Sequence, residues 1–272
     1  MLSKHRIRAA FSRAAASYDH VTQLHRQVGE QLLALLQPCG KDRVLDVGMG
    51  TGYLASVLAR YCPGIGIYGC DIAHQMNKFV LLHKEYGKIY PATCDAEHLG
   101  YKSHSLDSVI SNLSLQWLPD LSRGLKEIHR VLKPGGRIAV SLFGEGTLNE
   151  LYDSYASAYR QCKGKPFEYA HMFVSGQELA DKLTGCNFKV QQVSLQNFQI
   201  LYPEVKTLLK ALAQMGAKNA SLNRPRGLVG RRLMQRMEQV YRERYSEKGM
   251  IRSSFRVIMA SAVKATGRRR DE

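Results

Sequence analysis

The sequence predicts an α/β protein with an open, mostly parallel sheet and helices on both of its faces. Short apolar runs alternate with amphipathic runs between residues 42 and 143, and this alternation is typical of parallel strands joined by helices. The first apolar run leads into glycines at alternate positions, Gly48, Gly50 and Gly52. Because open α/β sheets bind ligands beyond the carboxyl ends of their strands, these glycines also mark the expected site.

Each element follows from a local pattern. Two helices are expected first, at 3–16 and 21–37, since apolar positions recur every three or four residues and Pro38 stops the second. Strands are then expected at 42–47, 66–71, 88–95, 106–113 and 136–143, and helices at 54–62, 75–86 and 121–132. The residues Lys133-Pro134-Gly135-Gly136 predict a helix stop and a turn into the next strand.

The alternation of strands and helices ends after the strand expected at 136–143. Aromatic-rich helical stretches and a loose segment occupy 147–185 and predict an insertion over the top edge of the sheet. Strand periodicity returns at 188–202, helices are expected at 203–217 and 227–245, and a closing strand at 252–265. The expected division is an N-terminal helical cap over the active site (1–40), a cofactor-binding core (41–146), a helical insertion or lid (147–187) and a C-terminal part of the core with basic helices (188–272).

Composition excludes several classes of protein. No apolar run approaches the roughly 20 residues that span a bilayer, so we expect a soluble, cytoplasmic protein without a membrane partner. The cysteines lack any CxxC pair, which predicts reduced thiols rather than a metal site or a disulfide framework; they are Cys39, Cys62, Cys70, Cys94, Cys162 and Cys186. The first twenty residues, basic and Ala-rich, are similar to a transit peptide, but we expect them to belong to the fold.

The positive charge is unevenly distributed. From residue 200 onward the chain has 17 Lys and Arg against 6 Asp and Glu, so +11 of the formal net charge of +16 lies in the last quarter. Such a field suggests an acidic partner. Nucleic acid, anionic lipid and an acidic protein would all satisfy it, as would a merely soluble basic surface.

The glycine spacing and three acids indicate the ligand. The loop is GxGxG rather than the GxGxxG of dinucleotide-binding proteins, and Asp46 before it suits a ligand with positive charge. Asp71 ends the second strand, about twenty residues after the glycines, where a carboxylate can accept both hydroxyls of a ribose. Asp95 ends the third strand and can accept the exocyclic amine of adenine. Together they predict a site for S-adenosylmethionine.

The motifs DVGMGTG (46–52), CDIAHQM (70–76), CDAEHL (94–99) and HRVLKPGGRIAVS (129–141) resemble the class I, Rossmann-like methyltransferases. The resemblance implies a seven-stranded sheet of order 3-2-1-4-5-7-6 with an antiparallel seventh strand. The cofactor contacts that it implies are made by Asp46, Gly48, Gly50, Gly52, Asp71, Ile72, Met76, Asp95, Ala96, Asn112 and Leu113. In this set Asp71 would hold the ribose, Asp95 the adenine, and Asn112 the methionine moiety, with S-adenosylhomocysteine as the product.

Three segments outside the core, AAFSRAAASYDHVTQLHRQ (9–27), SNLSLQW (111–117) and LKALAQMGAKNA (209–220), are similar to the malonyl-acyl-carrier-protein O-methyltransferases of biotin synthesis. The implied reaction esterifies the free carboxylate of malonyl-acyl carrier protein, or of malonyl-coenzyme A, and so primes pimeloyl synthesis. That carboxylate is already ionised near neutral pH, so we expect positioning rather than acid–base catalysis. Tyr18, Gln116 and Trp117 are the candidates for orienting the substrate.

The resemblance also implies a partner, an acidic acyl carrier protein that bears malonyl-phosphopantetheine. Its expected docking face is formed by the basic residues Arg224, Arg226, Arg231, Arg232 and Arg236. The sequence departs from the family at Met49, where Cys is common, at Ala73, where a small polar residue is usual, and at Arg252 and Arg256 in the closing strand.

Three alternative functions stay open. The chain could methylate another small carboxylate, such as trans-aconitate, or a quinone carbon. Methylation of carbon would require a base for the departing proton, and none is evident. It could be a respiratory complex I assembly factor that binds the cofactor without methylating. RNA methylation fits the charge, but aromatic residues interleaved with Lys and Arg, which RNA recognition favours, are not evident, so nucleic acid is the less favoured partner.

Overall fold

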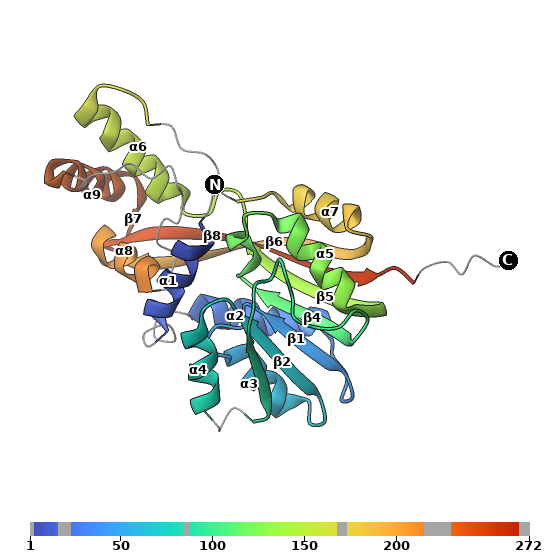
Figure 1. Ribbon diagram of the computed structural model, residues 1–272. Coiled ribbons are helices and arrows are strands. Elements are labelled where there is room, and N and C mark those ends of the chain that lie inside the picture. The colour runs from blue at the N-terminus through green and yellow to red at the C-terminus, as the bar shows by residue number, and fades with distance from the viewer. Residues whose placement is uncertain (1–2, 16–22, 84–86, 168–172, 215–229, 267–272) are drawn as a thin grey trace.

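The computed structural model describes residues 3–15, 23–83, 87–167, 173–214 and 230–266 (Figure 1). Its sheet has the order β3-β2-β1-β4-β5-β8-β6. The strands are β1 (Arg43–Val47), β2 (Gly66–Asp71), β3 (Ile89–Thr93), β4 (Leu106–Asn112), β5 (Leu132–Phe143), β6 (Phe188–Tyr202), β7 (Ser246–Glu247) and β8 (Met250–Lys264). Strand β8 is antiparallel to both β5 and β6. The predicted order is therefore present, with β8 as the seventh strand and the two-residue β7 paired to it as an unpredicted eighth.

Helices cover both faces of this sheet. They are α1 (Lys4–Ala14), α2 (Gln23–Leu36), α3 (Tyr53–Tyr61), α4 (His74–Leu82), α5 (Leu121–Val131), α6 (Asn149–Lys163), α7 (Gly176–Gly185), α8 (Val205–Gln214) and α9 (Arg231–Tyr245), with a 3₁₀ turn η3 (Leu115–Trp117). Because successive strand side chains point to opposite faces, Val44 joins the core cluster beneath α2 and α3, whereas Leu45 joins the one beneath α5 and α7.

The residues between α5 and β5 differ from the expected turn. Helix α5 ends at Val131, and β5 begins at once with Leu132, which pairs with Leu106 of β4. The register then shifts before Arg137 meets Ser108. The residues expected to form a turn between α5 and β5 thus lie within β5, as an irregularity between its pairs at Leu132 and Arg137, where Gly135 has a φ of +75°.

Helix α7 lies within the predicted helical insertion but was not predicted as a separate helix, although the sequence contains its start signal. The Ser175 hydroxyl accepts from the Glu178 N–H at 3.1 Å, and the Glu178 carboxylate accepts from the Ser175 N–H at 2.7 Å. This reciprocal capping box begins the helix. Leu179 and Leu183 are then buried in the cluster that contains α5, so this part of the insertion belongs to the core.

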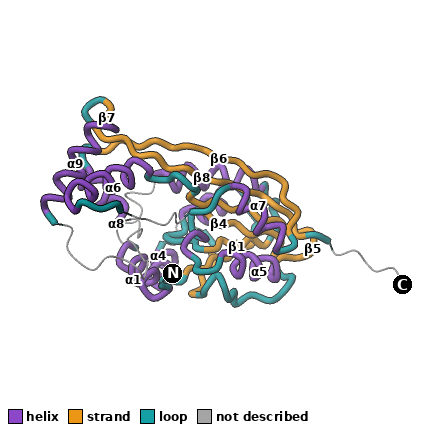
Figure 2. Tube along the Cα trace, turned by 90° about the horizontal axis from the view of Figure 1, so that it is seen from above, coloured by secondary structure: helices purple, strands orange, loops and turns teal. Residues whose placement is uncertain are grey.

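The rest of the insertion, α6, lies beside α9, and the two helices form an antiparallel pair at one end of the molecule (Figures 1 and 2). Arg244 near the end of α9 donates to Asp153 near the start of α6 at 2.8 Å. Arg236, nearer the start of α9, donates to Gln161 at the far end of α6. The domain division stays a prediction. Helix α2 packs into the main core, where Val28 is fully buried.

Parallel pairing brings the carboxyl ends of β1, β2, β3 and β4 to one edge of the sheet. The glycine loop, Asp71, Asp95 and the segment after Asn112 all leave the sheet there. Helix α1 lies beside α4 at this edge in both views (Figures 1 and 2). None of the helices within the described ranges is long and apolar enough to cross a membrane.

Candidate functional site

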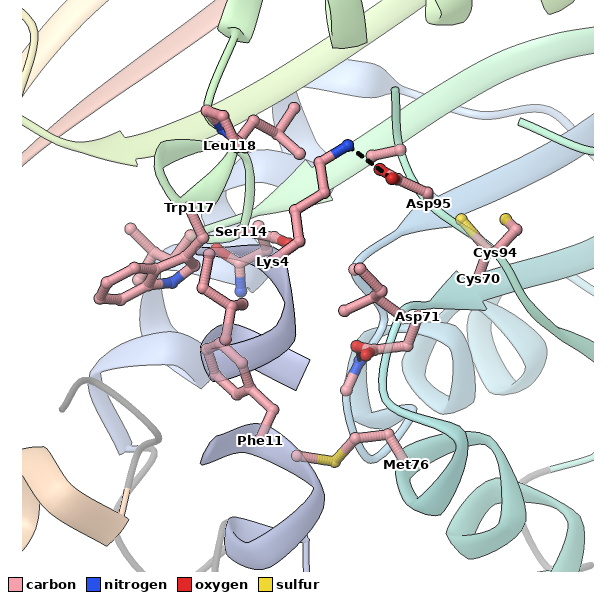
Figure 3. A pocket seen from close by; sticks show the side chains of 18 residues that line it. Lys4, Phe11, Cys70, Asp71, Met76, Cys94, Asp95, Ser114, Trp117 and Leu118 are labelled. Atoms are coloured by element: carbon pink, nitrogen blue, oxygen red, sulfur yellow. Dashed lines mark hydrogen bonds and ion pairs between the residues drawn. The ribbon is translucent and has the colours of Figure 1, made fainter. Parts of the chain in front are cut away.

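A pocket opens at this edge of the sheet, between the loops that follow four strands and the helix α1 (Figure 3). Its walls are formed by Lys4, Ile7, Phe11, Gly48, Gly50, Cys70, Asp71, Ile72, Met76, Cys94, Asp95, Ala96, Asn112, Leu113, Ser114, Trp117, Leu118 and Pro119. Most of the predicted cofactor residues are thus brought together. Asp46 and Gly52 do not line the pocket, and their roles stay predictions.

The glycine loop is held against the end of β2 and against the loop after β4. The N–H groups of Gly48 and Met49 both donate to the Cys70 carbonyl, at 2.8 and 3.0 Å. Gly48 has a φ of +73°, and a Cβ there would lie 1.8 Å from the Ser114 hydroxyl oxygen. Only glycine permits this approach, because it tolerates positive φ and has no side chain.

Met49, the first departure from the family pattern, points away from the pocket. Its thioether lies over Gly69 of β2, where a Cβ would come within 2.0 Å of the sulfur. Met49 is 6% exposed and is absent from the pocket wall. The larger side chain is accommodated because its neighbour is a glycine.

Asp71 is oriented by backbone groups on both sides. Its two carboxylate oxygens accept from the Gly50 N–H at 3.1 Å and from the Ala73 N–H at 2.8 Å. Each oxygen keeps acceptor capacity for a further partner. Burial raises the pKa of Asp71 to about 6, against the two backbone hydrogen bonds, which lower it. Ala73 contributes its backbone here, so the second departure removes no side chain that this arrangement needs.

Asp95 is paired with Lys4, a contact that no local pattern in the sequence predicted. Lys4 Nζ lies 2.6 Å from an oxygen of Asp95 and 2.5 Å from one of Glu97. The other Asp95 oxygen accepts from the Glu97 N–H at 3.0 Å. Burial would raise the pKa of Asp95, but the hydrogen bonds from Lys4 and from the Glu97 backbone lower it below its ordinary value.

These residues fit the cofactor that the resemblance implies. Two carboxylates lie at the ends of neighbouring strands, Asp71 with free acceptor capacity and Asp95 beside the Ala96 backbone. The apolar Ile72 and Met76 line the same pocket. Two carboxylates that can accept hydrogen bonds, apolar walls and the glycines Gly48 and Gly50, which have no Cβ atoms, line one continuous site.

The loop after β4 is fixed by its own polar groups. The Asn112 amide donates to the His25 carbonyl of α2 and accepts from the Ser141 hydroxyl, both at 2.8 Å. Leu113, which follows, has a φ of +47° and donates its N–H to Ser141 Oγ at 3.0 Å. A positive φ costs a leucine free energy, so these hydrogen bonds hold the chain where it passes the pocket.

The three candidate substrate residues have different positions. Trp117 lines the pocket and makes an edge contact with Phe11, the ring centroids 5.9 Å apart. Gln116 does not line the pocket, and its amide donates to the Leu113 carbonyl at 2.7 Å. Tyr18 lies outside the described residues. Their roles toward a substrate stay predictions.

Sequence reasoning predicted a helical cap over the active site at 1–40 but named none of the α1 residues that line the pocket. Lys4, Ile7 and Phe11 line the pocket, and their spacing of three and then four residues places them on one face of the helix. The pattern was visible in the sequence, but nothing local indicated that these three side chains would line the pocket. Among the described residues, no group of three or more His, Cys, Asp or Glu side chains is arranged to hold a metal ion.

The third departure concerns the start of α6 rather than the pocket. Arg252 Nε lies 3.8 Å from a carboxylate oxygen of Glu150. The Arg256 guanidinium lies against Gly146, and its backbone carbonyl accepts from the Thr147 hydroxyl at 2.9 Å. Neither arginine lines the pocket, so these two residues of β8 add no charge to the pocket wall.

Asp46 provides a pH-dependent prediction. Burial and the charge of Asp71 raise the pKa of Asp46 from 3.8 to about 7. Between about pH 4 and pH 7 the unfolded chain therefore loses a proton that the folded chain keeps, and the free energy of unfolding falls as pH rises. We expect Asp46→Asn to stabilise the protein more at pH 8 than at pH 5, by at least about 1.4 kcal/mol, which corresponds to one pKa unit. Urea unfolding at both pH values measures this, and an equal effect at each would show that Asp46 ionises normally.

Comparison with known proteins gives consistent results. A family profile described as "Methyltransferase domain" matches residues 45–140. A malonyl-[acyl-carrier protein] O-methyltransferase of Geobacter sulfurreducens is 35% identical over 95% of this chain and 98% of its own. One of Methylococcus capsulatus is 34% identical over 92% and 90%. Among solved structures, a geranyl diphosphate C-methyltransferase of Streptomyces coelicolor with bound S-adenosylhomocysteine superposes with a TM-score of 0.54 at 14% identity, over 87% of this chain and 75% of that one.

Proposed function

Because this chain belongs to the malonyl-[acyl-carrier protein] O-methyltransferase family, we propose that it transfers a methyl group from S-adenosylmethionine to the free carboxylate of a malonyl thioester. The acyl group is carried by acyl carrier protein, and the methyl ester enters pimeloyl synthesis for biotin. The observation that supports this most directly is the pocket in which Asp71, Asp95 and the glycine loop meet.

In this proposal the bound cofactor supplies an activated methyl group, and the chain supplies position. Asp71 accepts from the ribose, Asp95 accepts from the adenine amine, and Ile72 and Met76 enclose the base. Phe11 and Trp117 close the side of the pocket toward α1 and exclude water. A malonyl carboxylate is already ionised at neutral pH, so holding it in line with the methyl group is the chain's main task.

The reaction is tested with purified protein and malonyl-acyl carrier protein. We expect a methyl ester to form only when S-adenosylmethionine is present. Mass spectrometry of the acyl carrier protein measures its formation. The same gene should restore growth of a biotin-requiring strain that lacks this methyltransferase, with pimeloyl monomethyl ester as the rescue control. Protein that binds the cofactor but transfers no methyl group to malonyl thioesters would favour an assembly factor instead.

We further propose that the carrier protein docks at one end of the α6–α9 pair. Arg231 and Arg232 are exposed at the start of α9. Because the helices are antiparallel, the end of α6 lies at the same end of the pair, and it carries exposed Arg160, Lys163 and Lys165. Arg236 is engaged with Gln161 and, at 3.8 Å, with Glu243, so we give it a lesser part. Arg224 and Arg226 lie outside the described residues.

Reversal of the charge at the start of α9 is expected to weaken the use of malonyl-acyl carrier protein more than the use of malonyl-coenzyme A. Arg231→Glu with Arg232→Glu should raise the Michaelis constant for malonyl-acyl carrier protein at least about tenfold at low salt, because like charges replace attraction to an acidic partner. The constant for malonyl-coenzyme A should change much less. The matched control is Lys102→Glu with Lys189→Glu, two exposed lysines on other elements. Equal changes for both substrates would contradict docking at this end.

A further inference from the structure

The ion pair between Lys4 and Asp95 joins helix α1 to the cofactor site. Lys4 is in the first turn of α1, and its partner is 91 positions away at the end of β3. Asp95 is the carboxylate to which we assign the adenine amine. In this arrangement the Lys4 ammonium donates to the same carboxylate that the amine would use (Figure 3).

Glu97 gives Lys4 a second carboxylate that the cofactor does not need. Its side chain is 5% exposed, and one oxygen accepts from Lys4 at 2.5 Å. The other oxygen accepts from the Asp120 N–H at 3.0 Å, directly after the loop that carries Trp117. A buried carboxylate that loses its cation is strongly destabilised, so Glu97 retains Lys4 whether or not Asp95 is engaged elsewhere.

The apolar contacts of α1 are also made with the pocket. Phe11 contacts Trp117 and belongs to a small cluster with Ala15, Ala73 and Met76. This cluster is separate from the two large cores on the faces of the sheet. Within the described residues, the apolar contacts of α1 thus lie around the pocket and not in either large core, and elements outside the main cores open at lower cost than the rest of a fold.

We propose that α1 is a lid over this pocket and that Lys4 holds it closed. We call the contacts of Lys4 with Asp95 and Glu97 the latch. With the adenine position empty, Lys4 bridges Asp95 and Glu97 and holds α1 closed. When the adenine amine engages Asp95, Lys4 remains on Glu97, so α1 closes over the bound cofactor. Entry of S-adenosylmethionine and release of S-adenosylhomocysteine then both require the latch to open. Lys4 acts as a positioning residue, and this role rests on the proposed function of the pocket.

The test uses the binding kinetics of S-adenosylhomocysteine with the full chain. Trp117 is the single tryptophan and contacts Phe11 of the lid, so stopped-flow tryptophan fluorescence reports on this site directly. Because a gate affects both directions of exchange, we expect Lys4→Met to raise the association and dissociation rate constants together, each about tenfold, while the Kd changes less than threefold. One ion pair worth about 1.4 kcal/mol corresponds to tenfold in rate.

Three companion variants sharpen the result. Glu97→Gln keeps an oxygen for the Asp120 N–H but removes the charge, and it should reproduce the effect of Lys4→Met. The two changes together should exceed neither alone, since they break one interaction. Lys4→Arg should restore slow exchange. Lys78→Met, on an exposed position of α4, should leave both rate constants unchanged, and thermal unfolding verifies that every variant is folded.

Two results would overturn the latch. A rise in the dissociation rate constant alone would make Lys4 an ordinary affinity contact, and unchanged rate constants would show that α1 does not limit exchange. Wild-type protein that fails to bind S-adenosylhomocysteine at all would instead remove the proposed function, and the latch with it. The failures of the two proposals are therefore distinguishable.

Discussion

Asp71→Ala is expected to raise the Kd for S-adenosylmethionine at least about 100-fold, as measured by titration calorimetry. Hydrogen bonds to a charged group contribute roughly 1.5–3 kcal/mol each, and the proposal assigns two ribose hydroxyls to this carboxylate. The substitution also removes the acceptor that Gly50 and Ala73 share, which loosens the glycine loop. Asp71→Asn keeps one oxygen and should cost less, about tenfold.

Asp107→Ala is the matched control for this prediction. Asp107 accepts from the Arg43 N–H at 2.9 Å and from Lys133 at 2.6 Å, so it too binds a backbone group at the end of a strand. It lies at the amino edge of the sheet, away from the pocket. We expect lower stability without loss of affinity. Equal loss of affinity in both variants would show that Asp71 acts only through the stability of the fold.

Gly48→Ala is expected to have the second large effect. Its Cβ would lie 1.8 Å from Ser114 Oγ and 2.4 Å from Ser114 Cβ, and the φ of +73° disfavours any side chain. Relief of this clash separates the glycine loop from the loop after β4, so the pocket loses its shape. We expect the Kd for S-adenosylhomocysteine to rise at least about tenfold and the free energy of unfolding to fall by roughly 2–4 kcal/mol, from overpacking and from backbone strain.

A second substitution separates the two causes. Ser114→Gly removes both atoms that the new Cβ would meet, so Gly48→Ala with Ser114→Gly should recover most of the affinity, while the backbone strain remains. Gly100→Ala is the control, since its Cβ would meet nothing within 4 Å, and it should bind normally. Failure of Ser114→Gly to rescue binding would mean that positive φ alone, and not the contact with Ser114, makes glycine necessary.

The strands were predictable because each is marked by an apolar run within its own few residues. In β1 and β4, Val44 and Ile110 are buried on one face of the sheet, and Leu45 and Val109 are buried on the other. A parallel strand that is buried on both faces requires a continuous apolar run. The start of β5 was missed because Pro134 and Gly135 favour a turn, whereas pairing of Leu132 with Leu106 comes from a distant strand.

Some residues of the candidate site could likewise be predicted from the sequence, and others could not. Asp71 and Asp95 could be located from the sequence, because each follows a strand and parallel pairing sends both to one edge. The N-terminal helices were predicted to cap the active site, but Lys4, Ile7 and Phe11 could not be identified as the residues that line it. Gln116 and Trp117 were both predicted to orient the substrate, but of these two only Trp117 lines the pocket, since one step along a 3₁₀ turn changes the direction of the side chain.

The sequence by itself determined the order of strands and helices, the glycine loop and the acids at the strand ends, because each depends on the chemistry of a few neighbouring residues. Only the tertiary structure decided that Lys4 pairs with Asp95, that Gly48 must leave room for Ser114, and that the ends of α6 and α9 combine their charge. These contacts join residues far apart in the chain, and their geometry exists only after the sheet has formed and its loops have been brought to one edge.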